Sequence, residues 1–338
     1  MKTERYIEMK SPMTGGRVKL VEDIEEHEFR GDKYTVHVRY CTCEDTGEQF
    51  TIEGQDDFAL NQLYSQYRQA HGIPFADEIA SLRKRYDLNY TQIGKIMGFG
   101  VNQWKQYEQG VVPSESNGKI ILTIRSKQCM ISLLEASRAE FSASEFAKVK
   151  SCIMRAPQFQ ENPFKQRLLY GNTQRGMYNG FSEMNCDKLQ SMVRFLILRE
   201  GAGICPTKLN KEMFYSDFLH YRRHGLSISG LQYRAIQYGP VPEHYDTIYD
   251  NIEGVVKESF FAHDYEAVLL KCSDEIKSSA TPLSQDEQET LEDVSSILRP
   301  MSTSDVVELS HKEEAWKRNI QDRSIIPYCY AFELLAIA

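Results

Sequence analysis

The sequence predicts an α+β fold that is mainly α, with a small β-rich N-terminal module, a helix-turn-helix bundle and a mostly helical C-terminal domain. Three observations predict it. Apolar and polar residues alternate with period two before residue 58, apolar residues recur at helical spacing after it, and 338 residues exceed what one small core needs. We expect four segments: residues 1–58 as the β-rich module, 59–135 as the helix-turn-helix domain, 136–180 as a helix and linker, and 181–338 as the C-terminal domain.

The first segment is expected to form strands joined by glycine turns. Residues 18–21 and 34–40 alternate and are rich in β-branched and aromatic side chains, which favour strands. A helical pattern then runs from residue 58 to about 69, and Gly72-Ile73-Pro74 breaks it.

Three short helices are expected before Gly110 and Pro113, which end the pattern. The first covers residues 76–86. The second follows Asn89, a residue type that caps helices, and the third covers residues 101–108 after a glycine-rich turn. Two helices joined by such a turn predict a helix-turn-helix.

The third of these helices has the composition of a helix that contacts DNA bases. With Trp104 turned inward, Asn102, Gln103, Lys105 and Gln106 face outward. Asn and Gln pair with adenine in the major groove, and Lys meets guanine or phosphate. Glu108 would repel phosphate, so we expect it to point back into its own domain. A generic three-helix bundle with a polar surface is the alternative interpretation.

The rest of the chain is expected to be mostly helical. A helix is predicted at 143–155, and a polar stretch from 158 to 181 is interpreted as a linker. Helical periodicity resumes at residue 186. The further elements expected are helices at 207–223, 241–252, 284–298 and 302–318, and a strand at 255–261.

Charge and composition narrow the class of protein. The net charge is −8, but residues 60–135 carry +3, so the remainder carries −11. A mildly basic island in an acidic chain suits one DNA-facing module joined to something that does not face DNA. No apolar run reaches the roughly 18 residues of a membrane helix, no signal segment follows Met1, and the eight cysteines suit reduced thiols. We expect a cytoplasmic protein.

The segment from Asn89 to Pro113 resembles the helix-turn-helix of XRE-type regulators, and specifically of the MqsA-type (YgiT-type zinc finger) antitoxins. The resemblance covers residues 8–135 and implies that Asn102 and Gln106 contact operator bases. The family usually has arginine at the position of Gln106, so the family's base preference does not carry over to this chain. The motifs that carry it are Gly100-Val101-Asn102, Tyr107-Glu108-Gln109-Gly110 and Pro113-Ser114.

That family begins with a zinc ribbon built on two Cys-x-x-Cys-Gly knuckles. The matching places here are residues 11–15 and 43–48, where the glycines remain and three of the four thiols are replaced by Ser or Thr. Hydroxyls are poor zinc ligands, and Cys41 beside Cys43 cannot close a four-ligand site. We therefore expect no metal and no cofactor, and a module held by side-chain packing.

The C-terminal domain resembles the SocA-like, or Panacea, antitoxin domain. The resemblance implies direct binding of a toxin and fusion to an N-terminal DNA-binding module. The domain is also rich in aromatic residues, which suit protein interfaces, and we expect about half of them to be core. The motifs that carry the resemblance lie at residues 186–189, 209–220, 225–233, 238–242 and 309–316.

No motif predicts catalysis. His220 and His224 are four apart, but Tyr221 stands where a zinc protease needs glutamate, and a polar helix end is the better interpretation. His311 and Glu314 have no obvious third ligand. There is no phosphate loop, dinucleotide fingerprint or serine nucleophile motif. We expect no catalytic site and no enzyme.

The leading hypothesis is an antitoxin of a type II toxin–antitoxin system. It binds a cognate toxin and, as a homodimer, the operator DNA in its own promoter. One alternative is a transcription regulator whose C-terminal domain senses a ligand or a protein without neutralising a toxin. A more distant one is an adaptor that delivers a partner to a protease, a role known among SocA-like proteins.

Overall fold

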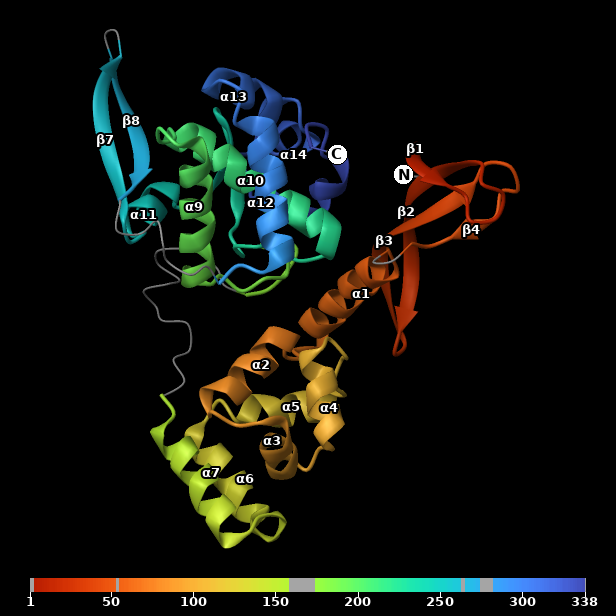
Figure 1. The fold of residues 1–338 in the computed structure, drawn as a ribbon, viewed down its shortest axis with the longest axis vertical. Helices are drawn as coiled ribbons and strands as arrows, with labels where there is room; N and C mark the ends of the chain where they lie inside the picture. The colour runs from red at the N-terminus through yellow and green to blue at the C-terminus, as the bar shows by residue number, and fades with distance from the viewer. Residues whose placement is uncertain (1–2, 53–54, 158–173, 263–264, 274–281, 338) are drawn as a thin grey trace. The chain divides into compact units, whose positions relative to one another are not determined.

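The structure is a computed structural model that describes residues 3–52, 55–157, 174–262, 265–273 and 282–337. The chain divides into two compact units, Met1–Glu161 and Asn162–Ala338 (Figure 1). Half of it is helical and 19% is strand, with a small N-terminal sheet, which confirms the predicted α+β, mainly α class. The predicted linker at 158–181 lies outside the described residues up to position 173, and the finer division into four segments stays a prediction.

The N-terminal sheet has four antiparallel strands in the order β1-β2-β3-β4. Alternate residues of the central pair bury one face, where Val18 and Leu20 pack with Cys41. The outer strands lack such an alternation, since β1 is exposed along nearly its whole length, and the sequence pattern did not reveal them. The strands are β1 (Thr3–Lys10), β2 (Arg17–Phe29), β3 (Asp32–Cys43) and β4 (Gln49–Phe50).

Helix α1 (Gln55–His71) packs against β3 and leads from the sheet to a helical bundle (Figure 1). Gln62 is buried in this contact. Its side chain accepts from the backbone N–H of His37 and donates to the carbonyl of the same residue, at 3.0 Å each. These bonds satisfy both backbone polar groups of His37 where the helix covers the strand.

The helical bundle of this unit has one apolar core. Its largest fully buried side chains include Trp104 and Tyr86, packed with Ile79, Leu82 and Ile93. The three helices predicted between residues 76 and 108 are confirmed to within one residue. The bundle consists of α2 (Ala76–Arg85), α3 (Tyr90–Met97), α4 (Val101–Glu108), α5 (Glu115–Thr123), α6 (Lys127–Ala136), the 3-10 turn η1 (Arg138–Glu140) and α7 (Ala143–Arg155).

The C-terminal unit is built around α10 (Pro206–His224), whose residues from Lys208 to Arg222 are all buried. Helices on several sides and a short terminal turn enclose it. None of the described helices has both the length and the apolar character that a bilayer-spanning helix requires. The surrounding elements are α9 (Cys186–Glu200), α12 (Gln285–Leu298), α13 (Thr303–His311), α14 (Glu314–Lys317) and the 3-10 turn η3 (Tyr328–Glu333).

Two predicted helices of this unit differ from the structure. The helix expected at 241–252 is shorter, because residues up to 242 belong to a hairpin. The helix expected at 302–318 breaks after His311, where the side chain of Glu313 turns inward to bind distant backbone groups. The remaining elements are β5 (Tyr233–Ile236), β6 (Gly239–Pro242), α11 (Tyr245–Asp250), β7 (Val255–Ala262) and β8 (Tyr265–Cys272).

Candidate nucleic-acid interface and the C-terminal unit

Local signals at both ends define α3, the first helix of the predicted helix-turn-helix. Asn89 caps it, since its side chain accepts from the Gln92 N–H at 2.9 Å while the Gln92 side chain accepts from the Asn89 N–H at 3.0 Å. Gly98 ends it in the left-handed conformation (φ +67°), which costs glycine little. The chain can therefore turn sharply and begin α4.

Helix α4 is anchored through aromatic side chains. Trp104 is fully buried and Tyr107 is 4% exposed. Phe99 from the turn stacks against Trp104 with ring centres 6.2 Å apart and meets the Tyr107 ring edge-on at 5.9 Å. These contacts fix the rotation of the helix about its own axis, so they decide which residues face solvent.

Glu108 points back into the bundle, as predicted. Its carboxylate accepts from the Arg83 guanidinium at 2.6 and 2.9 Å, from the Trp104 indole at 2.6 Å and from the Tyr90 hydroxyl at 3.2 Å. Burial would raise the pKa of Glu108, but these hydrogen bonds together hold the pKa below its ordinary value. The ionised carboxylate thus ties α4 to α2 and α3.

Three of the four predicted DNA-binding residues lie together on the surface. Asn102, Lys105 and Gln106 are exposed, and their spacing of three and four residues puts them on one face of α4. Gln103 is only half-buried and its amide donates to the Tyr107 hydroxyl at 2.7 Å. The exposed face therefore offers two amides and one ammonium group.

The two knuckle positions meet in the β-rich module around one thiol. Thr14 Oγ1 lies 3.4 Å from Cys43 Sγ, and hydrogen bonds from Ser11, Thr14 and Thr46 lower the pKa of Cys43 to about 6. Cys41 lies elsewhere, buried against Gln55. One thiol and three hydroxyls do not fit zinc, and the part of the chain that the structure describes contains no group of three His, Cys, Asp or Glu residues that could hold a metal.

In the C-terminal unit most aromatic residues are core. Eight aromatic residues made this region a candidate interface: Phe214, Tyr215, Phe218, Tyr221, Tyr233, Tyr238, Tyr245 and Tyr249. Six of them are at most 5% exposed and Tyr245 is half-buried. More than the expected half therefore belongs to the core. Tyr238 differs, with 61% exposure.

Tyr238 stands at the turn of the β5–β6 hairpin on a rigid support. The Trp316 indole donates to the Ile236 carbonyl at 2.8 Å at one side of the turn. At the other side Gly239 (φ +93°) sits so close to Ser310 and Lys211 that a Cβ would overlap both. The Tyr238 ring is thus exposed to solvent on a turn whose backbone is held at both sides.

The buried carboxylate of Asp217 has a structural role. Asp217 accepts from the N–H groups of Ile228 and Ser229 at 2.9 and 2.8 Å and from the Tyr233 hydroxyl at 2.6 Å. Complete burial raises the pKa of Asp217 to about 6 even though these hydrogen bonds favour the charged form. The carboxylate fixes the loop that follows α10.

The candidate histidines are placed for packing. The rings of His220 and His224 are 4.5 Å apart and perpendicular, and His220 is 7% exposed. Burial lowers the pKa of His220 well below its ordinary value, so its ring is neutral. His311 stacks on Trp316 at 4.0 Å. Among the described residues, neither His220 with His224 nor His311 with Glu314 belongs to a group that could bind a metal.

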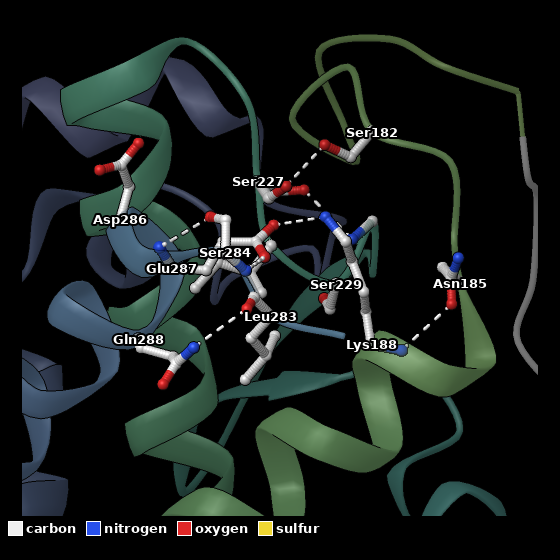
Figure 2. Close-up of polar contacts among 12 residues, drawn as sticks. Ser182, Asn185, Lys188, Ser227, Ser229, Leu283, Ser284, Asp286, Glu287 and Gln288 are labelled. Atoms are coloured by element: carbon white, nitrogen blue, oxygen red, sulfur yellow. Dashed lines mark hydrogen bonds and ion pairs between the residues drawn. The ribbon is translucent and has the colours of Figure 1, made fainter. Parts of the chain in front are cut away.

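Polar contacts join residues 182–188 to later parts of the unit (Figure 2). The Ser182 hydroxyl donates to the Ser227 carbonyl at 2.6 Å. Lys188 on α9 pairs with Glu287, which also closes the N-terminal cap of α12 with Ser284, as Figure 2 shows. The segment before α10 is therefore part of the same folded unit.

Comparison with known proteins identifies the central part of this unit. Residues 209–317 match the family model of the antitoxin SocA-like, Panacea domain. No curated protein and no solved structure matches the chain. This part of the C-terminal unit is therefore similar to the SocA-like Panacea antitoxin domain. The contacts of Ser182 and Lys188 extend the folded unit beyond the matched residues.

Proposed function

We propose that this protein is the antitoxin of a type II toxin–antitoxin system. Its C-terminal unit neutralises a cognate toxin by direct binding, and its helix-turn-helix represses the operon that encodes both. The observation that carries the proposal is the Panacea match at residues 209–317. The exposed face of α4 carries two amides and an ammonium group in the same chain as the Panacea match. This supports the proposed DNA-binding activity.

The DNA-binding half uses the exposed face of α4. Asn102 and Gln106 pair with adenine edges in the major groove, and Lys105 neutralises a phosphate. Two copies bind a palindromic operator with half-sites about 34–36 Å apart, as helix-turn-helix dimers do. Gln103 supports this face through Tyr107.

A transcription regulator that senses a ligand or a protein, without neutralising a toxin, is the second candidate. The observation that favours it is the burial of six of the eight aromatic residues, which leaves the C-terminal unit with fewer exposed anchors for a partner than its composition indicates. Both candidates require DNA binding, so toxin binding is what separates them.

The test combines two binding measurements on the full chain. The reading frame adjacent to this gene is co-expressed with the tagged protein, and co-purification of the two products in a fixed ratio is expected. Fluorescence anisotropy with the upstream DNA is expected to give specific binding that weakens with salt. DNA binding without a co-purifying partner supports the second candidate, and no specific DNA binding contradicts both.

A further inference from the structure

The loop that follows α4 is held by two arginines from outside the helical bundle. Arg30, at the turn between β2 and β3, donates to the carbonyls of Pro113 and Val112 at 2.6 and 2.7 Å. Arg68, near the end of α1, donates to the Gly110 carbonyl at 2.7 Å. Charged donors make stronger hydrogen bonds than neutral ones, so both fix the loop firmly.

The backbone conformation at Arg30 indicates that the arginine side chain has a role at this position. Phe29 pairs with Asp32, so Arg30 and Gly31 form a two-residue hairpin turn, with φ of +53° and +93°. Such turns favour Asn-Gly, because Asn tolerates positive φ better than other non-glycine residues do. Arginine accepts this unfavourable conformation here, and its guanidinium reaches the loop after α4.

Packing around the two arginines joins the same parts of the chain. The Arg30 guanidinium lies 5.0 Å from the Phe29 ring centre and 5.3 Å from that of Tyr67. Tyr67 and Val112 are buried in one apolar cluster. His71 contacts Asp32 at 2.6 Å and Glu115 at 3.2 Å, which links the hairpin to the first turn of α5.

The held loop is bonded directly to the last turn of α4. The Val111 N–H donates to the Gln106 carbonyl at 3.0 Å, so a displacement of the loop moves the end of the helix that carries Gln106. Because α4 is only eight residues long, a displacement of its last turn is transmitted to the whole helix. The Arg83–Glu108 pair holds the helix from the bundle side, and the two arginines hold it from the side of the sheet.

We infer that Arg30 and Arg68 are positioning residues for DNA recognition, through which the β2–β3 hairpin and α1 set the orientation of α4. The inference rests on the proposed DNA-binding function. The two arginines then act on base contacts through α4, without touching DNA themselves. A partner that displaces the hairpin turn would therefore change operator affinity.

Arg30→Asn tests the inference, because Asn-Gly suits this turn and the shorter side chain removes the guanidinium that reaches the loop. Operator affinity is expected to fall about 10-fold, with binding to unrelated DNA and the salt slope unchanged. Lys33→Ala, which removes a cation from the same hairpin without touching the loop, is the matched control and is expected to bind normally. Unchanged thermal unfolding shows that Arg30→Asn folds.

Several outcomes would overturn the inference. Normal operator affinity of Arg30→Asn is one. Equal weakening on all DNA with a salt slope reduced by about one is another, since it means that Arg30 contacts phosphate. In a double-mutant cycle, Arg30→Asn is expected to cost less on an Asn102→Ala background, and full additivity contradicts positioning.

Hydrogen exchange separates failure of this inference from failure of the proposed function. In the DNA-free protein, Arg30→Asn is expected to raise amide exchange in residues 101–113 relative to Lys33→Ala. If wild-type protein does not bind its upstream DNA, the proposed function fails. The exchange measurement still tests whether Arg30 holds α4 and the loop that follows it. Unchanged exchange in that segment overturns the inference whatever the DNA result.

Discussion

Glu108 is a single residue on which the orientation of α4 depends. It joins the guanidinium of Arg83 to the indole of Trp104, and both of these groups lie in the bundle. An acidic residue in a helix that faces DNA would ordinarily weaken binding. Here its charge is used internally, so the outward face keeps its amides and its lysine.

Acid should weaken the N-terminal unit through Glu108. Its pKa is lower in the folded than in the unfolded chain, so its stabilisation is complete above the ordinary value of 4.5 and is lost as pH falls through the folded value. Glu108→Gln is expected to lose about 2–3 kcal/mol at pH 7 and to show a smaller further loss at pH 3. Denaturant unfolding followed by Trp104 fluorescence in a Trp316→Phe background measures this. Equal acid losses in both proteins would contradict it.

The exposed residues of α4 should differ in what they contribute. Asn102→Ala is expected to cost about 1–3 kcal/mol of operator binding and to relax sequence preference. Lys105→Ala is expected to weaken all DNA about equally and to reduce the salt slope by about one. Titrations at three salt concentrations measure both. Unchanged affinity of Asn102→Ala, or altered base preference of Lys105→Ala, would require a different assignment.

At the scale of elements, we propose the β5–β6 hairpin as the contact for a partner protein. Tyr238 is exposed on a backbone that Trp316, Ser310 and Lys211 hold in place, and a rigid exposed aromatic ring loses little entropy on binding. Tyr238→Ala is expected to weaken toxin binding by about 2 kcal/mol. Tyr178→Ala, which removes another exposed tyrosine, is the control in calorimetry. Equal effects of the two variants would count against the hairpin.

The two knuckles of the β-rich module should accept zinc once their thiols are restored. Ser11, Thr14 and Thr46 all bond to Cys43, so four thiols at these positions would converge. The triple variant Ser11→Cys, Thr14→Cys, Thr46→Cys is expected to bind one Zn²⁺ per chain, and wild type none. Cobalt substitution with its thiolate charge-transfer band measures this, and adding Cys43→Ser is the control. A triple variant that binds no more metal than wild type would show that the positions do not converge.

Elements with strong local signals could be predicted from the sequence. The bounds of α4 follow from the glycine turn before it and Gly110 after it, and Asn89 predicts the start of α3. Elements defined by distant contacts could not. The break between α13 and α14 depends on Glu313, which binds the N–H groups of Leu335 and Ala336 about twenty residues later.

The candidate site was predictable in the same uneven way. Helical spacing placed Asn102, Lys105 and Gln106 on the surface, but it could not reveal that Gln103 donates to Tyr107. Helical spacing also could not reveal the role of Arg30, since its contact with Pro113 joins residues 83 positions apart. Side-chain hydrogen bonds of this range are decided by the packed structure and leave no periodic pattern.

At the scale of the whole molecule, two compact units carry two different functions in this proposal. The Panacea match lies in one unit and the predicted helix-turn-helix in the other, so we expect variants that abolish DNA binding to leave toxin neutralisation intact. This separation is what an antitoxin that also represses its operon requires.

Growth of cells that express the adjacent reading frame tests the central claim most directly. The frame is expressed alone, with this protein, and with its Asn102→Ala/Gln106→Ala variant, from a promoter that the protein does not control. We expect arrest of growth alone and recovery with either form of the protein, because neutralisation does not need DNA. A harmless neighbour, or a toxic one that the full chain does not relieve, would contradict the antitoxin function and leave a transcription regulator.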